Sequence, residues 1–339
     1  IMKEPYTISN IAKICGTSKA TVSRVLNTPE LVSKPLRSKV LTAMAEVGYT
    51  PNPFAKNLGN NGTWGIALFV FDILNPFFAL MVRQIGNQTM QKRIPLTVCD
   101  TENDKEKENV YLEYLLENKI GGIIFAEGIS PALIDRARKR VPTVLIDQHH
   151  LSGRIPEVAS DNFHGAMQAT EYLIQLNHRR IGFVAGPIDW MTAQERLSGY
   201  LEALAKHQID ADPQLIFHGD FLYESGLRAL EYFLGLQEWP TAVFCANDQM
   251  ALGILNKAQA MNISIPNDIS LVGFDAIPLL GFSAPKLTTV KQDIPELCRL
   301  AVDLLMKQRN GQPRCNRTAV PTRLIVGETC RKIDAAKIV

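Results

Sequence analysis

The sequence lacks the short motifs by which most nucleotide-dependent and hydrolytic enzymes are recognised. It contains no Gly-x-x-x-x-Gly-Lys phosphate loop, no Gly-x-Gly-x-x-Gly dinucleotide motif, no His-Glu-x-x-His zinc motif and no Gly-x-Ser-x-Gly nucleophile elbow. Each of these patterns places backbone amides, a metal or a nucleophile where the chemistry requires it. We therefore expect no enzymatic activity, no catalytic residue, no cofactor and no metal.

Cysteine pairs and long apolar runs are also missing. The six cysteines among 339 residues are scattered and never form Cys-x-x-Cys, which is typical of reduced thiols and of neither a disulfide framework nor a zinc site. No apolar run reaches the ~20 residues that a membrane-spanning helix needs, and the first residues lack the pattern of a secretion signal. These absences predict a cytoplasmic protein without a membrane partner.

What the sequence does contain begins with a helix-turn-helix pattern over residues 7–27. Thr7 can cap a first helix, and Gly16 stands where the chain must turn through a left-handed conformation. Ser18 can cap a second helix, in which Val22 and Val25 share one side. The other side carries Lys19, Ala20, Ser23, Arg24 and Asn27. A short helix of this composition fits the major groove of DNA; the alternative is an ordinary amphipathic helical hairpin.

A third helix and a linker are expected next. Ser33 can cap a helix that has Pro35 in its first turn and ends at Gly48. Its predicted apolar side consists of Leu36, Val40, Leu41, Met44 and Val47. Asn52 can then cap a helix of about two turns, which is too short to be stable alone, before the glycine-rich residues 59–62. This segment is either a hinge that folds on DNA with a partner chain or a plain interdomain linker.

The charge is divided between these parts of the chain. Residues 1–62 contain eight basic and three acidic residues, a net charge of +5, whereas the remainder contains 28 basic and 31 acidic residues, a net charge of −3. The total of +2 therefore conceals a basic first segment. Such a segment supplies phosphate contacts that weaken as salt rises.

Beyond residue 62, short apolar runs alternate with amphipathic helices. The predicted strands are 64–71, 94–99, 122–125, 143–146, 180–185, 215–217, 242–245, 270–274 and 288–291, and the predicted helices include 105–118, 164–176, 193–207, 224–234, 249–260 and 295–308. This alternation predicts two doubly wound parallel-sheet α/β lobes behind an α-helical head. Several strands end in polar residues, among them Asp72, Glu127, Asp147, Asp248 and Asp275, at the sheet edge where such folds bind ligands.

Residues 7–58 resemble the headpiece of the lactose-repressor (LacI/GalR) family of bacterial transcription regulators. The matching stretches are Thr-Ile-x-x-Ile-Ala from Thr7, Gly16-x-Ser18, Thr21-Val-Ser-Arg-Val-Leu-Asn27, Val32-Ser33, Gly48-Tyr-x-Pro-Asn52 and Ala55-x-x-Leu58. The resemblance implies a DNA surface made of Thr7, Ser18, Lys19, Ala20, Thr21, Ser23, Arg24 and Asn27. Arg24 would contact a guanine with two bonds. Asn52, Ala55 and Leu58 would enter the minor groove, with Leu58 wedged between base pairs.

The resemblance continues through nearly the whole chain. It is carried by Asn75-Pro-Phe-Phe78, Ser160-Asp-Asn162, His178-Arg-Arg-Ile-Gly182, Gly186-Pro187, Arg196-x-x-Gly-Tyr200, Asn247-Asp248, Gly253, Val272-Gly-Phe-Asp275 and Leu287-Thr-Thr-Val290. It implies a DNA-binding domain at 1–51, a hinge and linker at 52–62, and a periplasmic-binding-protein-like effector-binding and dimerisation domain at 63–339. The N-lobe would comprise about 63–161 and 291–322, and the C-lobe about 162–290 and 323–331.

By the same resemblance, a cleft between the lobes would bind a small effector. Its residues would be Phe77 or Phe78, Asp147, Trp190, Thr192, Arg196, Phe221, Asn247 and Asp275. Aromatic rings can stack on a sugar face, carboxylates can accept hydroxyl hydrogens, and an arginine offers a rigid fork of donors. The resemblance implies a homodimeric repressor that binds a near-palindromic double-stranded DNA operator. It also implies that a sugar or sugar acid regulates this binding allosterically.

Structural roles compete with several of these assignments. Phe77 and Phe78 could be core residues, Trp190 a loop anchor, and Asp72 and Asp248 caps of the helices that follow them. The remaining expectations are that Arg196 and Asp275 could pair across the cleft, that His149 and His150 lie at the surface or cleft edge, and that 102–108 is a solvated helix start.

Rival functions also stay open. The effector domain could serve a corepressor or a protein coregulator. A sugar-binding protein or a sugar-metabolising enzyme with this alternating fold is the weaker alternative, because neither would bind DNA with an affinity that falls steeply with salt.

Overall fold

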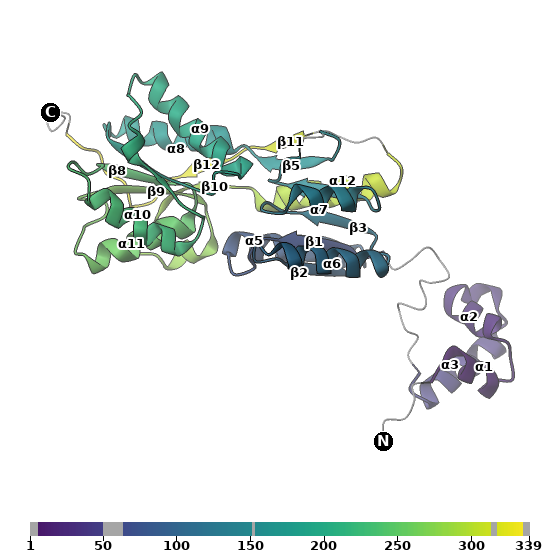
Figure 1. Ribbon diagram of the computed structural model, residues 1–339. Helices are drawn as coiled ribbons and strands as arrows, with labels where there is room; N and C mark the ends of the chain where they lie inside the picture. Colours follow the sequence, from purple (N-terminus) through teal and green to yellow (C-terminus); the bar gives the residue numbers. More distant parts are fainter. Residues whose placement is uncertain (1–5, 50–63, 151–152, 313–316, 335–339) are drawn as a thin grey trace. The chain divides into compact units, whose positions relative to one another are not determined.

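The computed structural model describes residues 6–49, 64–150, 153–312 and 317–334, which form two compact units that divide after Trp64 (Figure 1). We call the described residues before this boundary the head and those after it the body. Asn52, Ala55 and Leu58, three of the predicted DNA contacts, lie outside the described residues.

The head is built from three short helices around one core. They are α1 (Ile8–Ile14), α2 (Lys19–Asn27) and α3 (Lys34–Glu46), with a 3-10 turn at Pro29–Leu31 before α3. Ile11, Val22 and Val40, one from each helix, are fully buried. Each helix therefore contributes an apolar side to a core that none could form alone.

Two predicted details of α3 are wrong. Ser33 occupies the predicted N-cap position, but its hydroxyl makes no capping bond; Pro35 removes one of the two amides that such a hydroxyl can reach. Leu41 is 44% exposed, and Ala43 is buried instead. Val40, Ala43 and Met44 follow the three- and four-residue spacing of one helix face, and Leu41 lies off that face.

The body contains two six-stranded sheets. The first, in the order β11-β5-β4-β3-β1-β2, consists of β1 (Ile66–Val70), β2 (Leu96–Asp100), β3 (Gly122–Phe125), β4 (Thr143–Ile146), β5 (Glu157–Ser160) and β11 (Arg317–Val320). The second, in the order β12-β10-β9-β8-β6-β7, consists of β6 (Ile181–Ala185), β7 (Ile216–His218), β8 (Ala242–Cys245), β9 (Ser270–Asp275), β10 (Thr288–Lys291) and β12 (Arg323–Ile325). All these pairs are parallel except β10 with β12.

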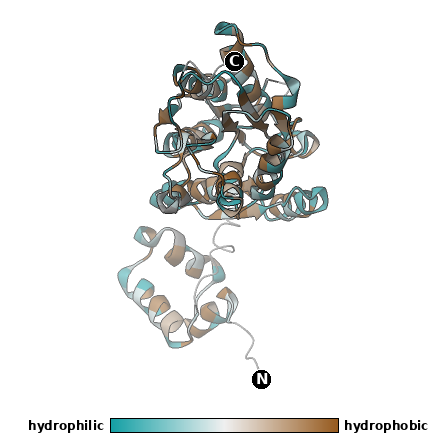
Figure 2. Ribbon diagram, turned by 90° about the vertical axis from the view of Figure 1, so that its left-hand side faces the viewer, coloured by the Kyte–Doolittle hydropathy of each residue, from teal (hydrophilic) through white to brown (hydrophobic). Residues whose placement is uncertain are grey.

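Helices cover both sheets and complete two lobes. The N-lobe consists of the first sheet with α5 (Pro76–Gln91), α6 (Lys105–Glu117), α7 (Pro131–Arg138) and α12 (Ile294–Arg309), and the C-lobe of the second sheet with α8 (Asn162–Gln175), α9 (Met191–Lys206), α10 (Tyr223–Leu234) and α11 (Asp248–Ala260). Hydrophobic residues concentrate on the strands inside these layers (Figure 2). The fold class predicted from the sequence is confirmed in this two-lobed arrangement.

Three segments of the described body connect the lobes. They follow β5 at residues 160–162, β10 at 291–294 and β11 at 320–323. Because all three connect the same two sheets, a change in the angle between the lobes must bend them together.

Strands β5, β11 and β12 were not among the predicted strands, and helix α7 was not among the helices given by range. Strands β5, β11 and β12 contain few apolar residues, and helix α7 has only eight residues. These segments are too short or too polar for hydrophobic periodicity to reveal them, and each is held in place by neighbours distant in sequence.

Candidate functional site

In the head, the turn between α1 and α2 has the predicted chemistry. The Thr7 side chain and the Asn10 side chain each accept a hydrogen bond from the other's backbone amide. Gly16 has φ of +61°, and the Ser18 hydroxyl accepts a bond from the Thr21 amide at 3.1 Å. Two capped helix starts around a left-handed residue fix the direction in which α2 leaves α1.

Helix α2 separates a buried side from an exposed one. Val22 and Val25 belong to the head core, whereas Lys19, Ala20 and Arg24 are exposed. Of the other predicted DNA contacts, Thr7 and Ser18 are exposed, Thr21 and Ser23 are half-buried, and the side chain of Asn27 is outside the described part. The exposed side of α2 thus offers two cations beside a small side chain, as a helix that enters a groove requires.

In the body, the predicted effector residues gather where the carboxyl ends of the two sheets face each other. Phe77 and Phe78 begin α5, and Asp147 follows β4, all in the N-lobe. The C-lobe contributes Trp190, Thr192, Arg196, Phe221, Asn247 and Asp275. Eight of the nine line one of two adjoining cavities, and Thr192 bonds to a residue that lines both.

Arg196 organises the inner end of this site. Its Nε donates to the Asn162 side chain at 2.9 Å, and its Nη1 donates to the carbonyl of Ala246 at 2.6 Å. Its guanidinium carbon lies 3.9 Å from the centre of the Phe274 ring. The carboxylate of Asp275 is 3.6 Å from Nη1. The expected pair therefore exists, but it lies within the C-lobe and does not cross the cleft.

A hydrogen-bonded network links this pair to the connecting segments. The Gln292 amide donates to Asp275 Oδ1 at 2.6 Å, and Gln292 also accepts a bond from the Ser160 hydroxyl. Burial raises the pKa of Asp275, while the nearby Arg196 opposes that rise. Gln292 and Ser160 lie at two of the three connections, so this network reaches the segments that join the lobes.

Asp147 has an oxygen that nothing in the described structure satisfies. The residue is 4% exposed, and its Oδ1 accepts the amide of Ser160 at 2.7 Å. Its Oδ2 is buried without a hydrogen-bond partner among the described residues, and burial raises the pKa of the carboxyl to about 6. A buried acceptor without a donor is costly, so this oxygen could accept one further hydrogen bond.

Glu127 joins the two lobes and was not among the predicted effector residues. It follows β3, and its carboxyl accepts the Thr192 amide at 3.2 Å and the Thr192 hydroxyl at 2.5 and 2.6 Å. Burial raises the pKa of Glu127 to about 8, so the carboxyl keeps its proton at neutral pH. Its place after β3, beside strand β4, which Asp147 follows, is the sequence signal that could have identified it.

Trp190 divides the space between the lobes. Its ring centre lies 4.9 Å from that of Phe71 in the N-lobe and 5.7 Å from that of Phe221 in the C-lobe. Gly128 has φ of +92°, and a Cβ at that position would lie 2.8 Å from the indole. The indole therefore bridges the lobes, and only glycine permits this approach.

The two cavities on either side of Trp190 differ in size and lining. The inner one, about 20 Å³, is lined by residues that include Phe77, Phe78, Arg196, Phe221, Asn247 and Asp275. The outer one, about 450 Å³, is lined by residues that include Asp147, Gln148, His149, Asp189 and Gln194. Only the outer cavity has room for a sugar-sized ligand, because one water already needs roughly 10–15 Å³.

Several alternative roles can now be assigned. Phe77 and Phe78 are both buried, at 7% and 4% exposure, and both also line the inner cavity. The N-caps of α5 and α11 are Asn75 and Asn247, so the expectation that Asp72 and Asp248 cap those helices is wrong. Asn247 also donates to the Phe221 carbonyl at 2.8 Å, and its side chain is therefore committed to local structure.

Two further expectations, for His149 with His150 and for residues 102–108, are each wrong in part. His149 lies at the edge of the outer cavity, 3.2 Å from Glu157, but its neighbour His150 is buried. Glu108 is 2% exposed and accepts a bond from the Ser130 amide at 3.1 Å. Residues 102–108 are therefore not uniformly solvated, because Glu108 holds the loop that follows β3.

Within the described ranges, no group of three or more His, Cys, Asp or Glu side chains is arranged to hold a metal ion. None of the described helices is long and apolar enough to span a membrane.

Two family models match the chain. Bacterial regulatory proteins of the lacI family match residues 7–52, and the periplasmic binding protein-like domain matches residues 170–330.

Known proteins resemble the chain over most of its length. The HTH-type transcriptional repressor CytR of Escherichia coli (strain K12) is 36% identical over 308 residues, which cover 90% of each chain. The Lac repressor dimer bound to operator and the anti-inducer ONPF has a TM-score of 0.85 at 27% identity, covering 97% of this chain and 100% of that one. A complex of the regulator CelR with cellobiose has a TM-score of 0.73 at 29% identity, covering 96% and 99%.

These relatives are transcription regulators rather than enzymes. The family predicted from the motifs is confirmed: the chain belongs to the lacI family of bacterial regulatory proteins and is a DNA-binding transcriptional repressor.

Proposed function

We propose that the body binds a neutral, hydroxyl-rich molecule of the sugar class in the outer cavity, and that this binding changes the affinity of the head for its operator. The observation that carries the proposal is the partnerless Oδ2 of Asp147, which lies in a residue lining this cavity. A ligand hydroxyl would donate to that oxygen while a ring packs against Trp190.

The charge of the outer cavity favours a neutral sugar over a sugar acid. Its lining includes the carboxylates Glu108, Asp147 and Asp189 and the protonated Glu127, but only Lys105 as a permanently charged cation. Arg196, the group that could pair with a ligand carboxylate, lines the inner cavity and is already bonded to Asn162, Ala246 and Asp275. A ligand carboxylate would meet like charges, which disfavours binding. The cellobiose held by the similar regulator CelR supports the sugar class.

Coupling to the head would pass through the connecting segments. A ligand beside Asp147 acts on Ser160, and through Gln292 on Asp275, so two connections respond to occupancy. Linkage requires only that the ligand bind one lobe arrangement better than the other. An inducer stabilises the arrangement that releases DNA, and a corepressor stabilises the one that retains it.

We further propose that two copies act together in the cytoplasm on a near-palindromic operator. One head reads half a site, and a two-fold symmetric pair of heads requires a matching two-fold DNA sequence. The Lac repressor to which this chain is similar is a dimer bound to operator. Lys19, Ala20 and Arg24 would contact bases, and Asn52, Ala55 and Leu58 would enter the minor groove.

A thermal-shift screen of the full chain tests the ligand class. The panel contains neutral monosaccharides and disaccharides, sugar acids, sugar phosphates and purines. A ligand at a hundred times its Kd stabilises the fold by about 2.7 kcal/mol. We expect a neutral sugar to stabilise the wild type and to lose this effect in Asp147→Asn.

The matched control is Asp303→Asn, which removes the same charge from a half-buried residue paired with Arg299, outside both cavities. It should respond to the sugar as the wild type does. A sugar acid that stabilises more strongly than any neutral sugar, or full sugar affinity in Asp147→Asn, would overturn the proposal. If no compound of the panel stabilises the wild type, a protein coregulator would be favoured over a small-molecule effector.

A further inference from the structure

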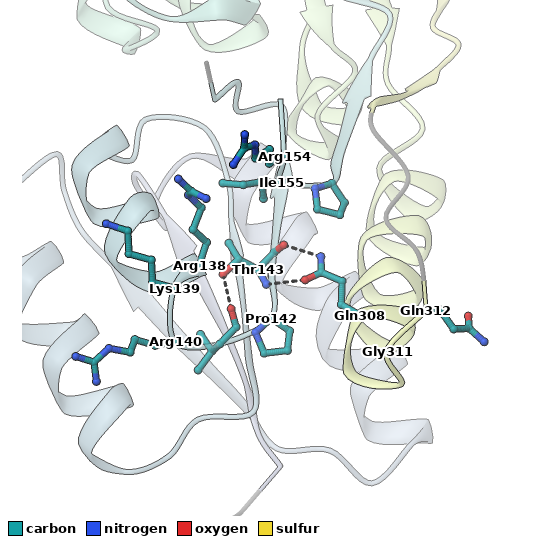
Figure 3. A pocket seen from close by; sticks show the side chains of 12 residues that line it. Arg138, Lys139, Arg140, Pro142, Thr143, Arg154, Ile155, Gln308, Gly311 and Gln312 are labelled. Carbon is teal, nitrogen blue, oxygen red and sulfur yellow. Dashed lines mark hydrogen bonds between the residues drawn. The ribbon is translucent and has the colours of Figure 1, made fainter. Parts of the chain in front are cut away.

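A second hollow lies in the N-lobe at the opposite end of its strands from the effector residues. It has a volume of about 430 Å³ and is bordered by residues 138–143, 154–156, and 308 with 311–312 (Figure 3). These residues surround the amino-terminal ends of β4 and β5, whereas Asp147 and Ser160 stand at the carboxyl ends of the same strands. The hollow therefore shares no residue with the effector cavities.

One wall of the hollow is fixed by a side-chain clamp. Gln308 on α12 accepts the Thr143 amide at 3.2 Å and donates to the Thr143 carbonyl at 2.8 Å (Figure 3). The Thr143 hydroxyl donates to the Val141 carbonyl at 3.0 Å, and Ile155 and Pro156 are buried. The wall is thus held by β4 and α12 and does not depend on a loose surface loop.

The lining of this hollow carries charge of one sign. Four of its twelve residues, Arg138, Lys139, Arg140 and Arg154, are cations, and none is a carboxylate. Residues 63–339, by contrast, have a net charge of −3. Asp135 pairs with Arg138 at 2.6 Å and compensates one cation. Among the described residues, Lys139 and Arg140 form no ion pair, so the hollow retains a surplus of positive charge.

Helix capping explains only part of this surplus. Helices α7 and α12 both end at the hollow, and each carboxyl terminus carries about half a negative charge. Together the two termini offset roughly one cation, and the Asp135 carboxylate offsets another. The remaining positive charges border the same hollow, where a bound anion would offset their mutual repulsion.

We propose that this hollow binds a phosphate group. Arginine side chains form paired charge-assisted bonds to phosphate oxygens, and a concave site of one sign concentrates the attraction for a multiply charged anion. Arg138 and Arg154 reach the same end of the hollow, while Lys139 and Arg140 extend along the α7 side (Figure 3). The phosphate belongs either to a free phosphorylated metabolite or to the DNA backbone.

The first experiment titrates inorganic pyrophosphate into the full chain by calorimetry at constant ionic strength. We expect saturable binding that Arg140→Gln weakens about tenfold, since a charge-assisted bond is lost. The matched control is Arg136→Gln, which removes the same charge beyond the hollow, where Arg136 pairs with Glu113 at 3.1 Å. This control should bind pyrophosphate as the wild type does.

A second experiment distinguishes the two sources of phosphate. If the DNA backbone occupies the hollow, Arg140→Gln lowers the slope of log affinity against log salt for the operator by about one, and pyrophosphate competes with DNA. If a free metabolite occupies it, the slope is unchanged while pyrophosphate binding is weakened. Either result supports a phosphate site.

Two results would overturn the proposal. One is a wild type that binds no pyrophosphate together with an operator slope unchanged by Arg140→Gln. The other is an equal loss of pyrophosphate binding in Arg136→Gln and Arg140→Gln, which would make the effect one of overall charge. Neither result bears on the effector cavity, because sugar stabilisation should be the same in both variants.

Discussion

The head and the body build their sites in opposite ways. The head presents one contiguous helix, Lys19–Asn27, whose caps, turn and exposed side all lie within about twenty neighbouring residues. The body assembles its cavities from segments that follow strands of two different sheets. A contiguous site is held by local bonds, whereas an assembled one depends on the packing of the whole body. A substitution in the head should therefore affect only its immediate neighbours, whereas a substitution in the cavities of the body should also lower the stability of the whole body.

The largest expected effect is that of Arg196→Ala in the body. It removes the partner of the buried Asp275 and the donor to Asn162 and Ala246. Breaking a buried ion pair costs on the order of 3–5 kcal/mol, so the free energy of unfolding of the body should fall by that amount. Calorimetry of the full chain measures it, and an equal loss in the transition of the head would contradict the separation of the units.

The free energy of unfolding of the body should depend on pH through the carboxyl group of Glu127. Its pKa is about 8 when folded and 4.5 when unperturbed, so the folded carboxyl keeps a proton that the unfolded one loses between these values. Stability is therefore full below about pH 4.5 and falls as the pH rises through about 8, by up to ~1.4 kcal/mol per pH unit.

Glu127→Gln should reduce that slope, because the amide stays neutral and still accepts from Thr192. Denaturant unfolding at pH 5, 6, 7 and 8 measures the slope. Glu113→Gln changes an exposed carboxylate of the same lobe and serves as the control. An unchanged slope in Glu127→Gln would show that other groups dominate the pH dependence.

In the head, Arg24→Ala should weaken operator binding by on the order of 1–3 kcal/mol and relax the preference at one base pair. The side chain is exposed, so the thermal transition of neither unit should move. Fluorescence anisotropy with operator and random duplexes measures both affinities. Equal losses on the two duplexes would refute a base contact.

The smallest effect compares two serines in the head. Ser18 makes a capping bond to the Thr21 amide, and its replacement by alanine should cost about 1 kcal/mol of stability. Ser33 makes no capping bond, so Ser33→Ala should change stability by less than about 0.5 kcal/mol. Thermal unfolding of the two variants without DNA measures both losses of stability. Equal losses in Ser18→Ala and Ser33→Ala would contradict the prediction.

The head and the body also differ in how much of their structure could be predicted from the sequence. The caps at Thr7 and Ser18 and the left-handed Gly16 were predictable, because their causes lie within three or four residues. The buried strands were predictable from their apolar runs. Leu41 and the hydroxyl of Ser33 were not, since a small difference of helix phase decides the exposure of Leu41 and the orientation of the Ser33 side chain decides whether it caps α3.

In the body, the sequence indicated where ligands gather but not what the residues do there. Asp147 and Arg196 were identified through family motifs, whereas Glu127 was noted only as a polar strand end. Its bond to Thr192 joins two lobes, and the position of Trp190 depends on the absence of a side chain at Gly128. Such contacts arise from the approach of separate segments, which local sequence patterns do not encode.

The most direct test is the operator affinity of the full chain with and without the neutral sugar that stabilises it. We expect the sugar-saturated protein to bind its operator at least about fivefold more weakly or more tightly, as allosteric coupling of about 1–3 kcal/mol requires, and we expect Asp147→Asn to abolish this difference. A sugar that stabilises the body while leaving operator affinity unchanged would contradict the claim that the body controls the head.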